Sequence, residues 1–141
     1  MPLDSDYQTR RLPIPLLVLC LLLMLVQPVN VGLTAARALD GLAVRGLPAV
    51  LVLLLRLLAA ALGVGAGRSL LARRAGAVKL AKTALAAGAA ADLVLYLTPY
   101  FPGNRAPGET PVLVAFSLTY YSGWWLYLSR SRRVSEALGS D

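Results

Sequence analysis

The chain has 141 residues, of which 57% are apolar and only 15% are charged, whereas soluble domains are about 45–50% apolar and roughly 25% charged. The apolar residues fall in blocks that are too long for a soluble core but suit a bilayer, which argues against a soluble protein. The net charge of +7 comes from Lys and Arg at the ends of these blocks, so it indicates membrane topology and argues against nucleic acid as a partner.

We expect an all-α integral membrane bundle, a single domain of four transmembrane helices. The expected spans lie at about residues 12–34, 46–67, 77–98 and 110–129, with a linker at 35–45 that can form a short interfacial helix, a basic loop at 68–76, a turn-rich loop at 99–108 and a tail at 130–141. Each span is long enough to cross roughly 30 Å of hydrocarbon at about 1.5 Å per residue.

The first span contains three prolines, two at its start and one in its interior. Pro13 and Pro15 suit a helix start, where a missing backbone N–H costs little. Pro28 lies inside the span and predicts a kink.

The same segment also allows a second interpretation. Arg10 and Arg11, the apolar stretch and the small residues around Arg37 together resemble a cleavable signal peptide. Against cleavage, the apolar run is longer than the roughly 7–15 residues of a signal peptide. If cleavage occurred, three spans would remain.

The basic residues predict that both chain ends lie in the cytoplasm, because cytoplasmic loops carry the excess of Lys and Arg. With the amino terminus inside, the inner side holds Arg10, Arg11, Arg68, Arg73, Arg74, Lys79, Lys82, Arg130, Arg132 and Arg133. The outer side holds only Arg37, Arg45 and Arg105. We therefore expect a multi-pass protein of a bacterial inner membrane.

Two opposite charges fall inside spans, where charged residues are costly and are candidates for function. Arg56 lies about 15 Å from the outer end of the second span, and Asp92 lies about 9 Å from the outer end of the third. The reach of an arginine side chain allows the two to meet.

The other two spans carry polar residues at a similar depth, namely Gln27, Asn30, Ser117 and Tyr121, with Tyr120 next to Tyr121. The sequence therefore predicts one intramembrane cluster built on Arg56 and Asp92. Such a cluster can fix how the helices pack, or it can bind a solute. Alternatively, Arg56 reaches toward the membrane surface and does not meet Asp92.

The glycine-rich segment from Gly63 to Gly67 follows no strand and lacks the spacing of nucleotide-binding loops. Gly63 and Gly67 instead form a small-xxx-small pair, as do Ala84 and Gly88, and such pairs let helix backbones approach closely. Cys20 is expected to be a small packing residue.

The inner basic residues are expected to set the topology and can also contact anionic phospholipids. The candidates for lipid contact are Arg68, Arg73, Arg74, Arg130, Arg132 and Arg133. The aromatic run from Tyr120 to Tyr127 is interpreted as an anchor at the membrane interface.

The segment from Trp124 to Val134 ends in Ser131, Arg132, Arg133 and Val134. It resembles the ending of a bacterial family of small four-span inner-membrane proteins that is catalogued as a domain of unknown function. In that family an aromatic stretch is followed by a Ser-[Lys/Arg]-Arg-Val motif just inside the membrane. The family's Gly-Trp-Leu near the start of the first span and its Thr-Phe after the motif do not occur here. The resemblance implies four spans and adds no activity.

We expect no catalytic residue, metal or cofactor, because no nucleophile–base pair, metal constellation or nucleotide motif is visible, and the absence of histidine excludes a Ser–His triad and a His-based zinc site. A membrane enzyme that uses Arg56 and Asp92 on lipid substrates is not excluded.

Two functions stay open. One is an accessory or structural subunit that packs against a membrane partner or a second copy through its small-residue faces. The other is an oligomeric transporter or pore subunit with a polar site around Arg56 and Asp92.

Overall fold

The computed structural model describes residues 12–98 and 106–138, and within these residues every regular element is a helix. The elements are α1 (Ile14–Leu21), a π-helical turn η2 (Leu22–Val26), α2 (Gln27–Leu39), α3 (Leu42–Arg45), α4 (Leu47–Leu71), α5 (Ala77–Leu97), α6 (Glu109–Arg130) and α7 (Arg132–Leu138). The all-α prediction is confirmed for this part of the chain.

Among the described residues, three helices are long and apolar enough to cross a membrane: the continuous helix Ile14–Leu39, α4 and α5. Helix α6 has 22 residues, which gives roughly 33 Å at helical rise. It is less apolar than the other three because it carries Ser, Thr and several Tyr residues. A membrane-embedded helical protein follows from the three apolar helices, and the fourth span stays a prediction.

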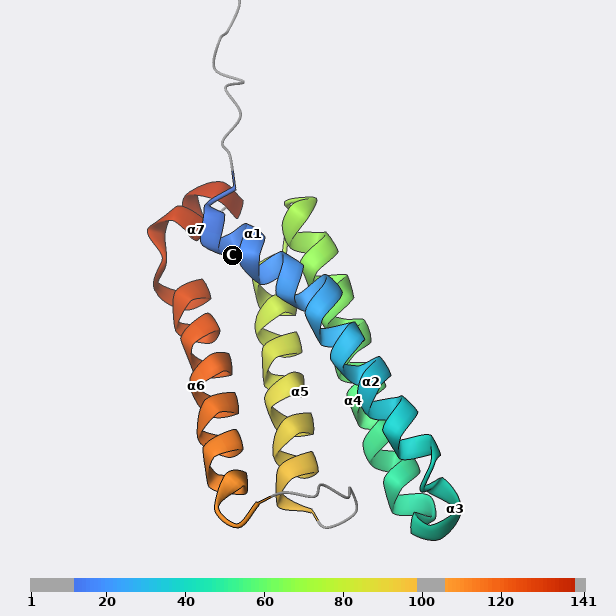
Figure 1. The fold of residues 1–141 in the computed structure, drawn as a ribbon. Helices are drawn as coiled ribbons and strands as arrows, with labels where there is room; N and C mark the ends of the chain where they lie inside the picture. The colour runs from blue at the N-terminus through green and yellow to red at the C-terminus, as the bar shows by residue number, and fades with distance from the viewer. Residues whose placement is uncertain (1–11, 99–105, 139–141) are drawn as a thin grey trace, which may run out of the picture.

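The helices form an elongated bundle in which α4, α5 and α6 run side by side (Figure 1). Helix α5 lies in the middle and contacts both α4 and α6, whereas the first helix packs against α4 and crosses it obliquely (Figure 1). The start of α1, the turn between α4 and α5, and α7 lie at one end of the bundle, and α3 lies at the other (Figure 1).

The first helix starts at Ile14, directly after Pro13, as the sequence predicts. Its irregularity is the π-helical turn, in which the backbone N–H of Gln27 donates to the carbonyl of Leu22, five residues earlier. Pro28 has no N–H to donate, and its ring crowds the carbonyl of the residue four positions before it. The distortion expected at Pro28 therefore takes the form of a widened turn just ahead of it.

The first helix also extends beyond Thr34, its expected end, to Leu39. Residues 35–39 read Ala-Ala-Arg-Ala-Leu, and these residue types have high helix propensity. The short helix expected in the linker is present at Leu42–Arg45.

The apolar core occupies the half of the bundle near α1 and α7. It consists of buried residues from four helices and α7, namely Leu16, Leu19, Cys20, Leu23, Ala66, Leu70, Ala77, Ala81, Ala84, Leu85, Leu128 and Val134. Many are alanines, so the backbones of α4 and α5 can approach closely. The prediction that Cys20 packs in the interior is confirmed.

Gly63 and Gly67 are the points at which α4 meets the first helix. A Cβ atom on Gly63 would lie 3.5 Å from the carbonyl oxygen of Leu23, and one on Gly67 would lie 3.4 Å from that of Cys20. The predicted close approach at this small-residue pair is confirmed, and its partner lies within the same chain.

The segment interpreted as a basic tail contains a further helix, α7. Val134 is buried in the apolar core, and Leu138, four residues later, packs against that core. The sequence analysis expected no helix in this segment. An apolar pair at this spacing lies on one helix face, which lets residues 132–138 pack against the core.

Candidate functional site

The structure pairs the two intramembrane charges that the sequence singles out. The Nη2 atom of Arg56 on α4 lies 3.1 Å from Oδ1 of Asp92 on α5. Both side chains are largely withdrawn from the surface, with 7% of Arg56 and 16% of Asp92 exposed. The structure therefore contradicts the alternative in which Arg56 reaches toward the membrane surface and does not meet Asp92.

Three hydroxyl groups complete the site. The Nη1 group of Arg56 donates to Oγ1 of Thr34 on α2 at 3.1 Å. Oγ of Ser117 and the phenolic hydroxyl of Tyr121, both on α6, donate to Oδ2 of Asp92 at 3.2 Å each. We call these five residues the polar cluster. Its members come from α2, α4, α5 and α6, so it connects the first helix with the three that follow.

The polar cluster satisfies the physical conditions for keeping charges away from water. Removing an ion from water costs several kcal/mol, and an ion pair recovers this only with good geometry and further hydrogen bonds. Both ions make such further hydrogen bonds here. Arg56 donates to Asp92 and Thr34, and Asp92 accepts three hydrogen bonds in all. The opposite charges cancel, so the site is electrically neutral as a whole.

Local sequence explains how Tyr121 reaches Asp92. Gly88 lies one turn before Asp92 on α5, and the ring of Tyr121 rests on it. A Cβ atom at position 88 would lie only 2.8 Å from the Cε1 atom of Tyr121 and 2.9 Å from its hydroxyl oxygen. Ser117 lies one turn from Tyr121 on the same face of α6, so both can address one carboxylate.

Gln27 and Asn30, the other two predicted members, lie beside the pair. Within the described residues, neither side chain hydrogen-bonds to Arg56 or Asp92. The Gln27 side chain packs onto Gly63, whose Cβ position lies 2.5 Å from the Gln27 Oε1 atom. The carbonyl of Asn30 accepts a hydrogen bond of 2.8 Å from Thr34 and so helps to orient that hydroxyl.

Two cavities adjoin the ion pair. The smaller has a volume of about 30 Å³ and is bordered by both Arg56 and Asp92, which is room for an ordered water between polar groups. The larger, of about 320 Å³, lies between the first helix, α5 and α6, and we call it the Asp92 cavity. It is lined by Leu22, Val26, Gln27, Asn30, Asp92, Ser117 and four aromatic side chains, Tyr96, Phe116, Tyr120 and Tyr121.

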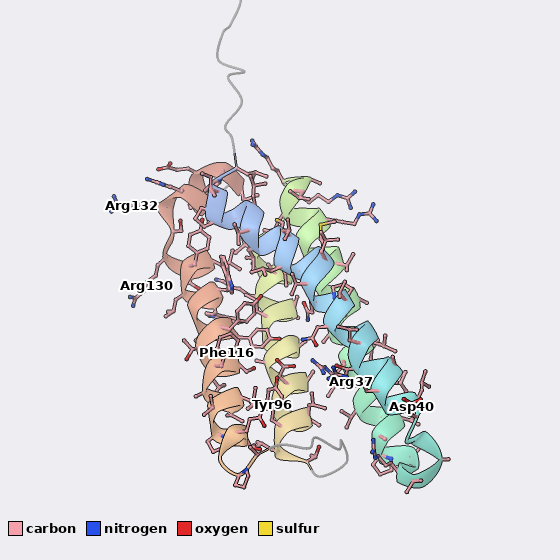
Figure 2. The ribbon with its side chains drawn as sticks, viewed as in Figure 1. Arg37, Asp40, Tyr96, Phe116, Arg130 and Arg132 are labelled. Atoms are coloured by element: carbon pink, nitrogen blue, oxygen red, sulfur yellow. The ribbon has the colours of Figure 1, made fainter. Side chains whose placement is uncertain are left out.

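Sequence reasoning missed three residues of this site: Thr34, Tyr96 and Phe116. Thr34 follows Gln27 and Asn30 at helical spacing, a signal that was available. Tyr96 lies four residues after Asp92 and is labelled with Phe116 in Figure 2. The position of Tyr96 one helical turn after Asp92 was an available signal, whereas Phe116 directly precedes Ser117 and therefore has no such spacing.

The six arginines proposed to contact lipid are all exposed. Arg130 and Arg132 extend away from the bundle in Figure 2. Nearby, the ammonium group of Lys82 on α5 lies 5.9 Å from the ring of Trp125 on α6, within the range of a cation–π contact. The basic residues at this end of the bundle are thus available to lipid headgroups.

The aromatic residues of the run from Tyr120 to Tyr127 on α6 have different surroundings and therefore different roles. Trp124 and Tyr127 pack against the apolar core with their rings in an edge-to-face arrangement, 5.8 Å between centroids. Trp125 is partly exposed, as an interface anchor would be, whereas Tyr121 belongs to the polar cluster.

Comparison with known protein families, with curated proteins and with solved structures finds no match for this chain. The resemblance of its last span to a four-span family therefore stays a prediction.

Proposed function

We propose that this chain is a small multi-pass protein of a bacterial inner membrane that serves as a structural or accessory subunit. The observation that carries the proposal is the polar cluster, in which each ion already has its partners within the chain. A neutral, hydrogen-bonded cluster of this kind fixes helix positions in lipid, where hydrogen bonds between helices contribute to association.

The proposal includes four spans with both chain ends in the cytoplasm. Helix α6 is long enough to cross, and it supplies two donors to Asp92, well inside the apolar length of α5. The excess of Lys and Arg at the end of the bundle that carries α7 supports a cytoplasmic location for that end, where these residues are placed to contact anionic phospholipids.

A protein partner or a second copy would meet a different surface from the one that the sequence suggests. Gly63, Gly67 and Gly88 are buried against side chains of the same chain. The exposed face of α4 instead carries leucines, including Leu51 and Leu58. We therefore propose that lateral contacts use this leucine-rich face.

The structural role is tested by a double-mutant cycle on the ion pair. Asp92→Asn leaves Arg56 without its counter-ion, and Arg56→Gln does the converse. Each change should lower the free energy of unfolding by about 3–5 kcal/mol, because a buried charge loses its partner. The double variant should be more stable than the worse single variant. Unfolding of the purified protein in mild detergent, followed by circular dichroism, measures all three.

Asp40→Asn is the matched control, since Asp40 is an exposed carboxylate at the end of α2. It should leave stability unchanged. If the double variant is no more stable than the worse single variant, the two charges do not stabilise each other and the structural proposal loses its basis.

A second function is favoured by the Asp92 cavity. A solute-binding or transport subunit needs a chamber beside its polar site, and a cavity of about 320 Å³ borders Asp92. Because four helices enclose little volume, transport would require an oligomer. The accessory role and the solute site differ in whether water reaches the cavity.

A further inference from the structure

We propose that the Asp92 cavity binds a small alkylammonium ion. The inference rests on the second of the two functions above, the solute site, and names the chemical class of the solute. Three properties of the cavity wall support it: its charge, the direction of its hydrogen bonds and its aromatic content.

The charged group that lines the cavity is the carboxylate of the ion pair. Asp92 is the charged residue among those that line the cavity, whereas Arg56 borders only the smaller cavity. Arg56 is bonded to Oδ1, and the Oδ2 atom accepts from Ser117 and Tyr121, which both line the cavity. A solute in the cavity therefore meets the carboxylate side of the ion pair, so the field favours a cation over an anion.

Two hydroxyl groups of the wall, those of Ser117 and Tyr121, are committed as donors to Asp92. Each hydroxyl has one hydrogen and two lone pairs, and Ser117 and Tyr121 both direct their hydrogens to Asp92. What remains for a solute is their acceptor capacity. The side-chain amides of Gln27 and Asn30 line the same wall, and each has an acceptor oxygen as well as an NH2 donor group. The two hydroxyl groups that bond to Asp92 thus present acceptors to the cavity, which suits a ligand that carries N–H donors.

Four aromatic side chains also line the cavity. Tyr120 and Tyr121 stand edge to face with 5.0 Å between their centroids, and Tyr96 and Phe116 line the same space. Ring faces attract an ammonium group, more strongly where water is excluded. The volume is at the small end of the range of ligand pockets. Together these features select a compact ammonium ion with a short alkyl chain that can lie against Leu22 and Val26.

The test measures binding to the full chain in nanodiscs of phosphatidylcholine, a lipid without net charge. The probe is n-butylammonium, compared by isothermal titration calorimetry with two molecules of similar size, neutral 1-pentanol and anionic pentanoate. We expect n-butylammonium to bind and the other two to bind weakly or not at all. Equal binding of all three, or preference for pentanoate, would overturn the inference.

Tyr120→Leu tests the aromatic wall without removing a donor from Asp92, because Tyr120 is not part of the polar cluster. Loss of the ring face should weaken n-butylammonium binding roughly three- to thirty-fold. Trp125→Leu is the matched control, an aromatic residue of the same helix outside the cavity, and should leave the affinity unchanged. Equal effects of the two substitutions would place the ligand elsewhere and would overturn the inference.

A separate measurement distinguishes a wrong solute class from a dry cavity. In a Cys20→Ala background, Gln27→Cys should react with a membrane-impermeant methanethiosulfonate, whereas Ala60→Cys, buried away from the cavity, should not. Labelling without n-butylammonium binding would overturn the ligand class and leave the solute site standing. Absence of both would overturn the solute site as well, while the double-mutant cycle continues to test the structural role alone.

Discussion

Two tyrosines on α6 show how much depends on a single hydroxyl group in this molecule. The hydroxyl of Tyr121 donates to Asp92. That of Tyr127 is buried and has no hydrogen-bond partner among the described residues. The same substitution at the two positions should therefore have opposite effects.

Tyr121→Phe should lower the free energy of unfolding by about 1.5–3 kcal/mol, the range for a hydrogen bond to a charged group. Tyr127→Phe should be neutral or stabilising, because it removes a desolvated group without breaking a bond within the described residues. Chemical unfolding of both variants in the same detergent compares them directly. A larger loss at Tyr127 than at Tyr121 would show that the cluster contributes less than its geometry suggests.

At the residue scale, the sequence predicted the ion pair because depth along a helix can be calculated from residue count. Arg56 is also the only charge of the expected span 46–67, and Asp92 is the only acidic residue of the span 77–98, which limits the choice of partners. Thr34 follows Gln27 and Asn30 at helical spacing, but this signal does not assign it to the cluster, since a threonine is compatible with lipid, water and protein alike. Its role depends on where the first helix crosses α4, which residue count alone does not define.

Three glycines on α4 have different surroundings although they lie within five residues. A Cβ atom on Gly67 would meet the Met24 side chain at 2.6 Å, whereas one on Gly65 would meet nothing within 4 Å. The spacing from Gly63 to Gly67 places these two on the face toward the first helix and turns Gly65 away from it.

Gly67→Ala should cost about 1–3 kcal/mol, because the Met24 side chain must move in a packed interface. Gly65→Ala should be neutral or should stabilise by roughly 0.5–1 kcal/mol, because alanine is the better helix former and space is available. Thermal unfolding of the two variants measures the difference. Destabilisation by Gly65→Ala equal to that by Gly67→Ala would mean that this face of α4 is covered by another molecule.

Helix positions were accessible from the sequence because long apolar blocks and prolines mark them. The form of the irregularity before Pro28 could not be predicted from the sequence, since the hydrogen bond that a proline cannot make can be accommodated by a kink or by a π-helical turn. Helix α7 was also missed, because seven residues with four charged or polar side chains carry too weak a pattern. Its Val134 is buried in the same apolar core as residues of the first helix and of α6, which lie far away in the sequence.

Orientation belongs to the whole molecule and can be measured with single cysteines in a Cys20→Ala background. Asp40, Ala72 and Ser135 are all exposed. In intact cells an impermeant thiol reagent should label Asp40→Cys and should reach Ala72→Cys and Ser135→Cys only after the membrane is permeabilised. Labelling of Ser135→Cys from outside would mean that α6 does not cross.

At this scale the sequence predicted the helical segments but not how they are arranged, and the sidedness stays a prediction. Which helix lies in the centre depends on matching of surfaces between segments far apart in the chain. The alanines of α5 and Gly88 are compatible with several neighbours, and only the complete set of contacts selects α4 on one side and α6 on the other (Figure 1).

The position of Asp92 within the helix that follows Arg56 has a consequence for biosynthesis. An arginine in the middle of a solitary span costs about 2.5–3.5 kcal/mol at the translocon. Only residues 72–76 separate α4 from α5, so the compensating carboxylate emerges from the ribosome with the next segment. We expect α4 and α5 to leave the translocon together as a charge-neutral hairpin, whereas α6, which brings Ser117 and Tyr121, joins later. The order of synthesis thus matches the order in which the cluster can be completed.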